Sequence, residues 1–297
     1  MRKSTIIGIA AGILSLVSIQ SSVPPETPLG LLSETILESD DPLFGGISAI
    51  DISDDGSRLL AISDNGSYTH GVITRDVSGR VESASFEPMK QLKTFRGSLY
   101  LSHKDTEGVA VGPDGTIYVS YELYALIAAF PTIDDFPVKL PSPPEFADYM
   151  NNRSLESLAI DREGVIYTVP EAPAGFGAEF PVFRFDGTDW DHELSLPRRG
   201  GYLAVSADFG PDGRFYLLER LYYGFPAFSS RLRRFDLTDQ GFVNEVTLFT
   251  TAIGTHENLE ALSVWRNPAG RLVATMMADD NFNALFSTQL DEYVLPD

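Results

Sequence analysis

Residues 47–66, ISAIDISDDGSRLLAISDNG, contain the unit that decides the predicted fold. Its two runs of alternating and β-branched residues are separated by Asp54-Asp55-Gly56 and followed by Asp64-Asn65-Gly66. Asp-Gly and Asn-Gly between such runs are typical of tight β-hairpins. With the Ser78-Gly79 turn further along, the segment predicts one antiparallel sheet of four strands: Ile47–Ser53, Arg58–Ser63, Tyr68–Val77 and Arg80–Glu87.

The same strand–turn–strand pattern returns at four further places along the chain. The glycines of the five equivalent turns are Gly56, Gly115, Gly164, Gly213 and Gly270, with separations of 59, 49, 49 and 57 residues. Similar units of this length, each with short strands and no helical periodicity, are typical of a β-propeller. We therefore predict an all-β propeller of five or six four-stranded blades, with no helix of useful length. A degenerate sixth copy would lie in the Pro-rich stretch Phe130–Pro144.

The two ends of the chain are predicted to meet. The last copy has only three predicted strands and ends with Ala284–Val294, whereas the apolar segment Leu29–Leu37 has no partner of its own. If Leu29–Leu37 supplies the missing strand, it closes the ring and removes an exposed sheet edge. The competing fold is a β-sandwich, which does not explain why the same turn recurs with the same neighbours.

Composition excludes several classes of protein. The chain has 297 residues, 22 Lys and Arg, 42 Asp and Glu, a formal net charge of −20, and no Cys. A disulfide-stabilised scaffold and a thiolate metal site are impossible without sulfur ligands. A nucleic-acid-binding protein needs a basic face, which this charge balance does not provide. We expect one large domain that does not bind nucleic acid and is present as a monomer.

The N-terminal segment has the features of a secretory signal peptide. Arg2 and Lys3 precede the uncharged run Thr5–Ile19, which is shorter than the roughly 20 residues that span a bilayer. We predict a signal peptide over residues 1–22 and a mature propeller domain over residues 23–297. This places the protein in the secreted or periplasmic space, with no membrane attachment after cleavage. The alternative is a membrane anchor or a buried N-terminal helix.

Three glutamates occupy equivalent positions of the repeat. Glu107 and Glu156 both lie eight residues before their turn glycine, and Glu260 lies ten before Gly270. Each begins the first strand of its unit, and first strands line the channel of a propeller, so the three side chains should share one region. Carboxylates that close together need a cation or a proton. Oxygen ligands without Cys favour Ca²⁺, with Mg²⁺ as the alternative.

Two interpretations of these glutamates remain open. Each could instead cap backbone N–H groups at the start of a strand and serve the structure only. The set is also incomplete, because we assign Val205 to the equivalent position of the fourth copy and Gly46 to that of the first.

Further charged residues end the second strands of the units: Asp64, Glu122, Glu171, Glu219 and Asp279-Asp280. Arg220 follows Glu219 and is suited to hold a carboxylate or phosphate through a two-pronged contact. Singly, each acidic residue is a common turn former. Their recurrence at one end of the strands marks that end as a candidate site, and an internal ion pair is the alternative role of Arg220.

Several catalytic motifs are missing from the sequence. It has no Gly-x-Ser-x-Gly nucleophile elbow and no His-Glu-x-x-His metal motif. His103 and His256 each lie four residues before a repeat glutamate, which makes them weak general-base candidates. An exposed loop histidine is the alternative for both.

An ordered set of short segments resembles the phytase-like family, which is also described as having esterase-like activity of the phytase type. The segments are Gly46–Asp51, Ala61–Asn65, Glu107–Val111, Asn152–Ala159, Leu217–Arg220, Asn258–Leu262 and Ala278–Phe282. The resemblance implies an exported bacterial β-propeller that binds calcium and hydrolyses phosphate or other esters. By motif position it implies the site residues Glu107, Glu156, Arg220, Glu260, Asp279 and Asp280.

These observations lead to a metal-assisted ester or phosphoester hydrolase as the first hypothesis. Glu107, Glu156 and Glu260 would hold Ca²⁺, Arg220 would neutralise charge on the transferred group, and Asp279 or Asp280 would position water. The substrate would be a small-molecule ester. One alternative is a non-catalytic propeller that binds an unknown protein ligand. The other is a sugar-lactone hydrolase, since those propellers also hold a channel metal with acidic side chains.

Overall fold

The computed structural model of this chain describes residues 30–95, 105–149, 154–172, 179–224 and 227–296. These residues form 21 β-strands and one short 3₁₀ helix, Pro144–Tyr149. The described part of the chain holds no helix with the length and hydropathy of a membrane span. The predicted signal peptide at residues 1–22 lies outside the described residues, and so does the candidate base His103.

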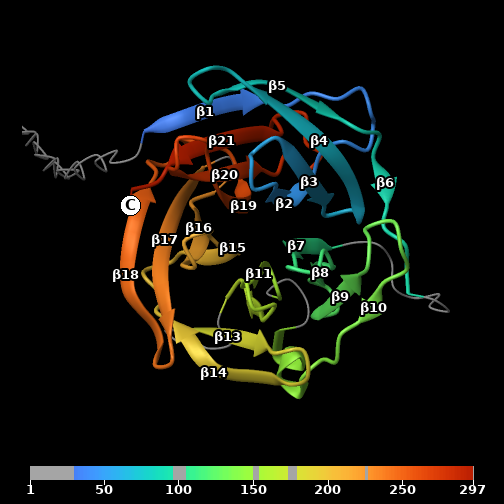
Figure 1. Cartoon of the computed structure of the whole chain (residues 1–297), viewed down its shortest axis with the longest axis vertical. Coiled ribbons are helices and arrows are strands. Elements are labelled where there is room, and N and C mark those ends of the chain that lie inside the picture. Colours follow the sequence, from blue (N-terminus) through green and yellow to red (C-terminus); the bar gives the residue numbers. More distant parts are fainter. Residues whose placement is uncertain (1–29, 96–104, 150–153, 173–178, 225–226, 297) are drawn as a thin grey trace, which may run out of the picture.

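The strands assemble into five antiparallel sheets, the blades of a propeller (Figure 1). Blade 1 contains β2 (Ile47–Ile52), β3 (Arg58–Ser63), β4 (Ser67–Arg75), β5 (Val81–Phe86) and the short β6 (Lys90–Gln91). Blade 2 contains β7 (Thr106–Val111), β8 (Ile117–Tyr121), β9 (Leu126–Phe130) and β10 (Val138–Lys139). Blade 3 contains β11 (Ser157–Ile160), β12 (Ile166–Val169), β13 (Phe180–Phe185) and β14 (Trp190–Leu196). Blade 4 contains β15 (Leu203–Phe209), β16 (Phe215–Tyr222), β17 (Phe228–Thr238) and β18 (Gly241–Thr250). Blade 5 contains β19 (Leu259–Arg266), β20 (Leu272–Ala278), β21 (Gln289–Val294) and β1 (Leu31–Ile36).

The first strand of each sequential repeat is the innermost strand of its blade. β2, β7, β11, β15 and β19 each contact the next inner strand around the ring, and β19 contacts β2. Figure 1 shows these five strands around the centre, with the later strands of each blade farther out. Within each blade, a hairpin turn joins the first and second strands. The glycines of these turns, Gly56 to Gly270, all have φ between 72° and 85°, a left-handed conformation that glycine adopts without steric cost.

The apolar core is divided into five clusters, one between each pair of neighbouring blades. The cluster between blades 5 and 1, for example, packs Trp265 and Met277 against Ile50 and Leu59. The other four clusters join the remaining pairs of blades in the same way. Every blade buries both faces against its neighbours, so apolar burial holds the ring, and hydrogen bonds between blades, such as Asp105 N to Asp64 O at 2.7 Å and Ala204 N to Glu171 O at 3.0 Å, add to it.

Five blades account for the described residues, and no sixth blade occurs among them. The stretch Phe130–Pro144, expected to hold a degenerate copy, instead contains β10, the outermost strand of blade 2. At the other end of the chain, β1 runs antiparallel to β21, with Glu34 opposite Asp291. β1 is thus the fourth strand of blade 5, and Figure 1 shows it in blue along the outside of the red β21.

Candidate functional site: an acidic pocket at the centre of the propeller

Two sets of equivalent positions meet at one end of the channel. We call inner positions the residues near the start of each inner strand: Ser48, Glu107, Glu156, Val205 and Glu260. We call outer positions the residues at the end of each second strand: Asp64, Glu122, Glu171, Arg220 and Asp279. In each blade the two positions are neighbours in the sheet, and nine of these ten residues line one central pocket, with Val205 in the apolar core as the exception.

A repeated backbone hydrogen bond establishes this equivalence. In four blades the backbone N–H of the outer-position residue donates to the carbonyl oxygen two residues before the inner position. The pairs are Asp64 to Gly46 at 2.8 Å, Glu122 to Asp105 at 2.7 Å, Glu171 to Ser154 at 2.9 Å and Asp279 to Asn258 at 2.9 Å. In blade 4, Arg220 lies opposite Leu203 in the corresponding register. The outer positions of all five blades are therefore fixed by the same local geometry.

A β-bulge lies at the inner position in four of the five blades. The pairing register shifts just after Ile47, Thr106, Ala204 and Leu259, at the same point in four blades. A bulge inserts one unpaired residue and turns its side chain away from strict alternation, and such bulges occur beside binding sites. The inserted residues include Glu107 and Glu260, which explains why distant segments present carboxylates to one pocket.

The resulting pocket encloses about 670 Å³. Seven carboxylic acids line it: Asp64, Glu107, Glu122, Glu156, Glu171, Glu260 and Asp279. Among the described residues that line it, Arg220 is the one basic side chain. Tyr222, Phe228 and Phe286 form an aromatic wall beside Arg220, with ring centroids 5.4 Å apart for Tyr222–Phe228 and 6.5 Å for Phe228–Phe286. The pocket thus combines a large excess of acid with one cation and an apolar wall.

Arg220 is held in place by its neighbours from two blades. Its Nη1 donates to Glu260 Oε1 and, at 2.6 Å, to Asn258 Oδ1, while Nη2 donates to Glu171 Oε1 at 3.2 Å. Asn258 Nδ2 also donates to Glu260 Oε1 at 2.8 Å. Burial alone lowers the pKa of the guanidinium, but the charges of Glu260, Glu156 and Glu171 outweigh burial and raise it. Arg220 therefore stays charged and points into the pocket.

The remaining acids are not balanced by this one charge. Burial, and then the charges of Glu156 and Glu260, raise the pKa of Glu107 well above its usual range. Burial and the charges of Glu171 and Glu260 do the same for Glu156. Burial raises the pKa of Asp279 to about 9, with the charge of Glu260 as the next cause. Asp279 therefore holds a proton near neutral pH unless another positive charge enters the pocket, and burial shifts Glu107 and Glu156 toward the protonated form.

The donor set fits a hard divalent cation. Glu107, Glu156 and Glu260 offer carboxylate oxygens in one pocket. The charges of Glu156 and Glu260 help to raise the pKa of Glu107, and the charge of Glu260 helps to raise the pKa of Glu156. Ca²⁺ and Mg²⁺ prefer oxygen ligands of this kind. The three donor groups do not all lie within 4.8 Å of one another in this structure. Their side chains would have to turn toward a common point to share one ion.

The structure brings five of the six predicted site residues together and separates the sixth. Asp280 does not line the pocket, because its carboxylate accepts hydrogen bonds from Gly46 N at 2.8 Å, Phe282 N at 3.0 Å and Thr288 Oγ1 at 2.9 Å. Asp280 therefore braces the start of blade 1 against blade 5. It is a positioning residue for the pocket rather than a group within it.

Two positional expectations were wrong. Ser48, not Gly46, is the inner-position residue of blade 1, because the bulge follows Ile47. Glu219 is not equivalent to Glu122 and Glu171; Arg220 is, since adjacent strand residues point to opposite faces. Glu219 is wholly buried away from the pocket, where Arg231 and Arg233 bind it.

His256 also lies away from the pocket. Its Nε2 is 2.6 Å from Tyr293 Oη, and its Nδ1 is 2.8 Å from Asp291 Oδ2. This arrangement does not support a general-base role in the central pocket. The outer positions Glu122 and Glu171, by contrast, line the pocket without having been assigned a role from the sequence. Both lie seven residues after their turn glycine, as does Arg220, and this constant spacing was the available signal.

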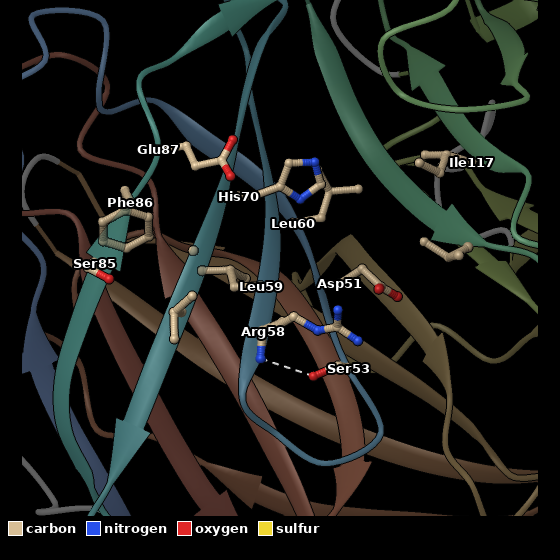
Figure 2. Close-up of a pocket in the computed structure, with 13 residues that line it drawn as sticks. Asp51, Ser53, Arg58, Leu59, Leu60, His70, Ser85, Phe86, Glu87 and Ile117 are labelled. Carbon is tan, nitrogen blue, oxygen red and sulfur yellow. Dashed lines mark hydrogen bonds between the residues drawn. The ribbon is translucent and has the colours of Figure 1, made fainter.

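A second pocket, of about 560 Å³, lies at the first blade and reaches the second (Figure 2). Its wall includes Leu59, Phe86 and Ile117 together with His70 and Glu87, and all five are labelled in Figure 2. It has no set of side chains at equivalent positions of the repeat. The central pocket is therefore the better candidate for a site built by the propeller.

Comparison with known families gives one match that covers most of the chain. The family model described as "Phytase-like: Esterase-like activity of phytase" matches residues 42–282. This range contains all of the inner and outer positions defined above. No match was found among curated proteins.

Solved structures with similar folds are distant in sequence. Virginiamycin B lyase from Staphylococcus aureus is 11% identical, with 89% of this chain and 98% of that chain covered and a TM-score of 0.43. The PQQ-bound aldose sugar dehydrogenase from Streptomyces coelicolor is 11% identical, with 92% and 100% covered and a TM-score of 0.48. A protein of unknown function from Dyadobacter fermentans is 8% identical, with 91% and 87% covered and a TM-score of 0.48. Identities and scores this low transfer no activity to the present chain.

Proposed function

The chain belongs to the phytase-like family, and from this membership and the central pocket we propose that it is a calcium-assisted hydrolase of phosphate or other esters. The observation that carries the proposal is the imbalance of charge in the pocket, where seven carboxylic acids surround one arginine. Such an arrangement is costly in a folded protein unless a cation or protons offset it. An exported location remains a prediction from the N-terminal segment.

Glu107, Glu156 and Glu260 are the proposed calcium ligands. They come from three blades, and their carboxyl oxygens are the ligand type that Ca²⁺ prefers over nitrogen or sulfur. A bound calcium ion would polarise the ester oxygen and lower the pKa of a water molecule. Mg²⁺ remains the alternative ion, with a stricter demand for octahedral geometry.

Arg220 is the proposed contact for the anionic part of the substrate. Its guanidinium is charged and positioned by Asn258, Glu171 and Glu260. A fork of N–H donors suits a phosphoryl or carboxyl group and can stabilise charge that develops in the transition state. Asp279, at the outer position of blade 5, is placed to orient water or to add a ligand oxygen.

The pocket also limits the substrate class. One arginine among seven acids repels a molecule with many phosphates, so a highly phosphorylated substrate such as phytate is disfavoured. The aromatic wall of Tyr222, Phe228 and Phe286 suits an apolar leaving group next to Arg220. We therefore propose a monoester whose alcohol or acid part is aromatic or otherwise apolar.

A panel of substrates with and without calcium tests the proposal. Nitrophenyl phosphate, nitrophenyl acetate, a sugar lactone and phytate are each incubated with the full chain in Ca²⁺ or in chelator. The expected result is calcium-dependent turnover of a nitrophenyl ester and weaker or no turnover of phytate. Turnover of the lactone alone would favour the sugar-lactone hydrolase. No turnover of any substrate would contradict the hydrolase proposal and favour a binding protein.

Glu156→Gln then tests the assigned residues. The substitution keeps the size of the side chain and removes one proposed ligand charge, so turnover should fall by about 100-fold and calcium affinity should fall with it. Glu163→Gln is the matched control, because the Glu163 side chain is 61% exposed and, among the described residues, forms an ion pair only with Arg162. Unchanged turnover and unchanged calcium affinity in Glu156→Gln would overturn the assignment.

A further inference from the structure

A second cluster of ligand-type side chains lies where the two ends of the chain pair. Glu34 on β1 is opposite Asp291 on β21, and His256 comes from the segment that precedes β19. One donor atom from each of the three lies within 4.8 Å of the others. Within the described ranges, this is the one group of three acidic or histidine side chains that meets this distance. None of its members lines the central pocket.

Two buried atoms in this cluster contact each other as an ion pair and have no hydrogen bond. His256 Nδ1 and Asp291 Oδ2 are 2.8 Å apart, on side chains that are 1% and 0% exposed. Neither atom has a hydrogen bond of acceptable geometry to any described residue. A buried polar atom without a hydrogen bond is costly, so two such atoms facing each other need an explanation. Two ligands at about 2.0–2.1 Å from one tetrahedral metal ion lie about 3.3 Å apart, so a separation of the two atoms by a further roughly 0.5 Å would let both bind one ion.

The other polar atoms of the same side chains are already engaged. His256 Nε2 is 2.6 Å from Tyr293 Oη, and Asp291 Oδ1 accepts a hydrogen bond from Gln289 Nε2 at 2.9 Å. Tyr293 is in turn stacked on Phe249, with ring centroids 4.9 Å apart. Outer partners of this kind fix the orientation of metal-binding histidine and carboxylate side chains. These contacts hold His256 Nδ1 and Asp291 Oδ2 toward one point beside Glu34.

We propose that Glu34, His256 and Asp291 bind a divalent transition-metal ion of the zinc type. One imidazole nitrogen and two carboxylate oxygens are ligands that Zn²⁺ accepts at about 2.0–2.2 Å, whereas Ca²⁺ prefers a larger set of oxygens. Glu34 is exposed, so an ion can reach the buried pair from solvent, and water can take a fourth position. The ligand set needs no cysteine, which this chain lacks.

The position of the cluster assigns the ion a structural role. β1 is the outermost strand of blade 5, and the other three strands of that blade come from the opposite end of the chain. An ion bound by Glu34 and Asp291 joins β1 to β21, and His256 adds the segment leading into β19. The ion would stabilise the pairing of β1 with β21 that closes the ring, independently of any calcium in the central pocket.

Zinc binding by the full chain tests this proposal. Chelator-treated protein is saturated with Ca²⁺, and then Zn²⁺ is titrated while melting temperature and bound zinc are measured. About one zinc ion per chain should remain after gel filtration, and the melting temperature should rise, because the ion binds the folded state only. Co²⁺ in place of Zn²⁺ should give visible absorption bands that free Co²⁺ does not give. No retained zinc, together with a cobalt spectrum like that of the free ion, would overturn the proposal.

Glu34→Gln is the informative variant because the side chain is exposed and its replacement should not prevent folding. Zinc affinity should fall by about tenfold or more. Glu38→Gln is the matched control, an equally exposed glutamate four residues away that should leave zinc affinity unchanged. Glu156→Gln should also leave it unchanged, which separates this site from the central pocket. An equal zinc affinity in wild type and Glu34→Gln would overturn the assignment and leave His256 and Asp291 as an ordinary ion pair.

Discussion

The surroundings of Glu219 and the central pocket lie on opposite faces of β16, and their ratios of acidic to basic side chains are opposite. Glu219 faces away from the central pocket, and its carboxylate accepts hydrogen bonds from Arg231 Nε at 2.7 Å and from Arg233 Nε at 2.8 Å. Arg233 also binds Glu245, and Glu245 binds Arg199, so basic residues outnumber acids there. One residue further along β16, Arg220 faces seven carboxylic acids alone.

Fold stability accounts for the first of these regions but not for the second. Fold stability favours a buried carboxylate with complete partners, as Glu219 has, because an unpaired buried charge is costly. The central pocket departs from this rule at equivalent positions of several blades. Sites where a local rule is broken are often functional, and here the excess of acid is what a cation would offset.

Glu219→Gln should have the largest effect of the substitutions considered. Removing this carboxylate leaves Arg231 and Arg233 buried without it, so the free energy of unfolding should fall by about 3–5 kcal/mol. Urea denaturation measures the change. The control is Glu156→Gln, the same chemical change in the pocket, which removes one acid from an excess. In calcium-free buffer its unfolding free energy should be unchanged or higher. Equal losses in the two variants would refute the contrast between the regions.

Arg220→Met should have a smaller effect that depends on calcium. Glu260 and Glu171 lose their cationic partner, so the unfolding free energy of calcium-free protein should fall by about 2 kcal/mol. Calcium should restore part of that loss by supplying positive charge to the same acids. Arg214→Met is the control: its side chain is 36% exposed, and its ion pairs with Asp212 and Asp236 are worth less than about 1 kcal/mol. A loss in Arg220→Met that calcium does not change would contradict the account.

The pH dependence of stability should differ with and without calcium. Burial, as the largest cause, raises the pKa of Asp64 to about 6, of Glu122 to about 7 and of Asp279 to about 9. A carboxyl with a raised folded-state pKa holds a proton that the unfolded chain has lost, so its contribution is complete below about pH 4. That contribution disappears as pH rises through about 6, 7 and 9 for the three groups.

Unfolding of the calcium-free protein between pH 5 and pH 9 checks this sign, with the range set by those pKa values. Each such group should lower the unfolding free energy by at most about 1.4 kcal/mol per pH unit within its own range. Saturating calcium should flatten the profile because it replaces the protons. Stability that stays constant or rises with pH in chelator would be the contrary result.

The ring of blades was predictable because its cause is local and repeated. Each Asp-Gly or related turn between alternating runs specifies a hairpin, and five copies specify a propeller without knowledge of long-range contacts. The inner glutamates were predictable for the same reason, since their distance from the turn glycine is nearly constant. The outer positions Glu122 and Glu171 share a spacing with Arg220 but differ from it in charge, which hid their equivalence.

Other features depend on direction and on distant pairing, which spacing does not reveal. Glu219 and Arg220 are adjacent, and only the pairing register of β16 decides which of them enters the pocket. Asp280 follows Asp279 but turns to the backbone of Gly46, far away in sequence. Glu34 and Asp291 meet only because β1 pairs with β21. In each case the outcome is set by tertiary structure rather than by the local pattern.

Calorimetric titration with calcium at neutral pH tests the central claim most directly. Carried out in two buffers of different ionisation enthalpy, it measures both calcium affinity and the protons released on binding. The account predicts binding with release of about one proton per ion, because burial raises the pKa of Asp279 to about 9 and this carboxyl must lose its proton to act as a ligand or neighbour of the ion. No binding, or binding with the same enthalpy in both buffers, would contradict it.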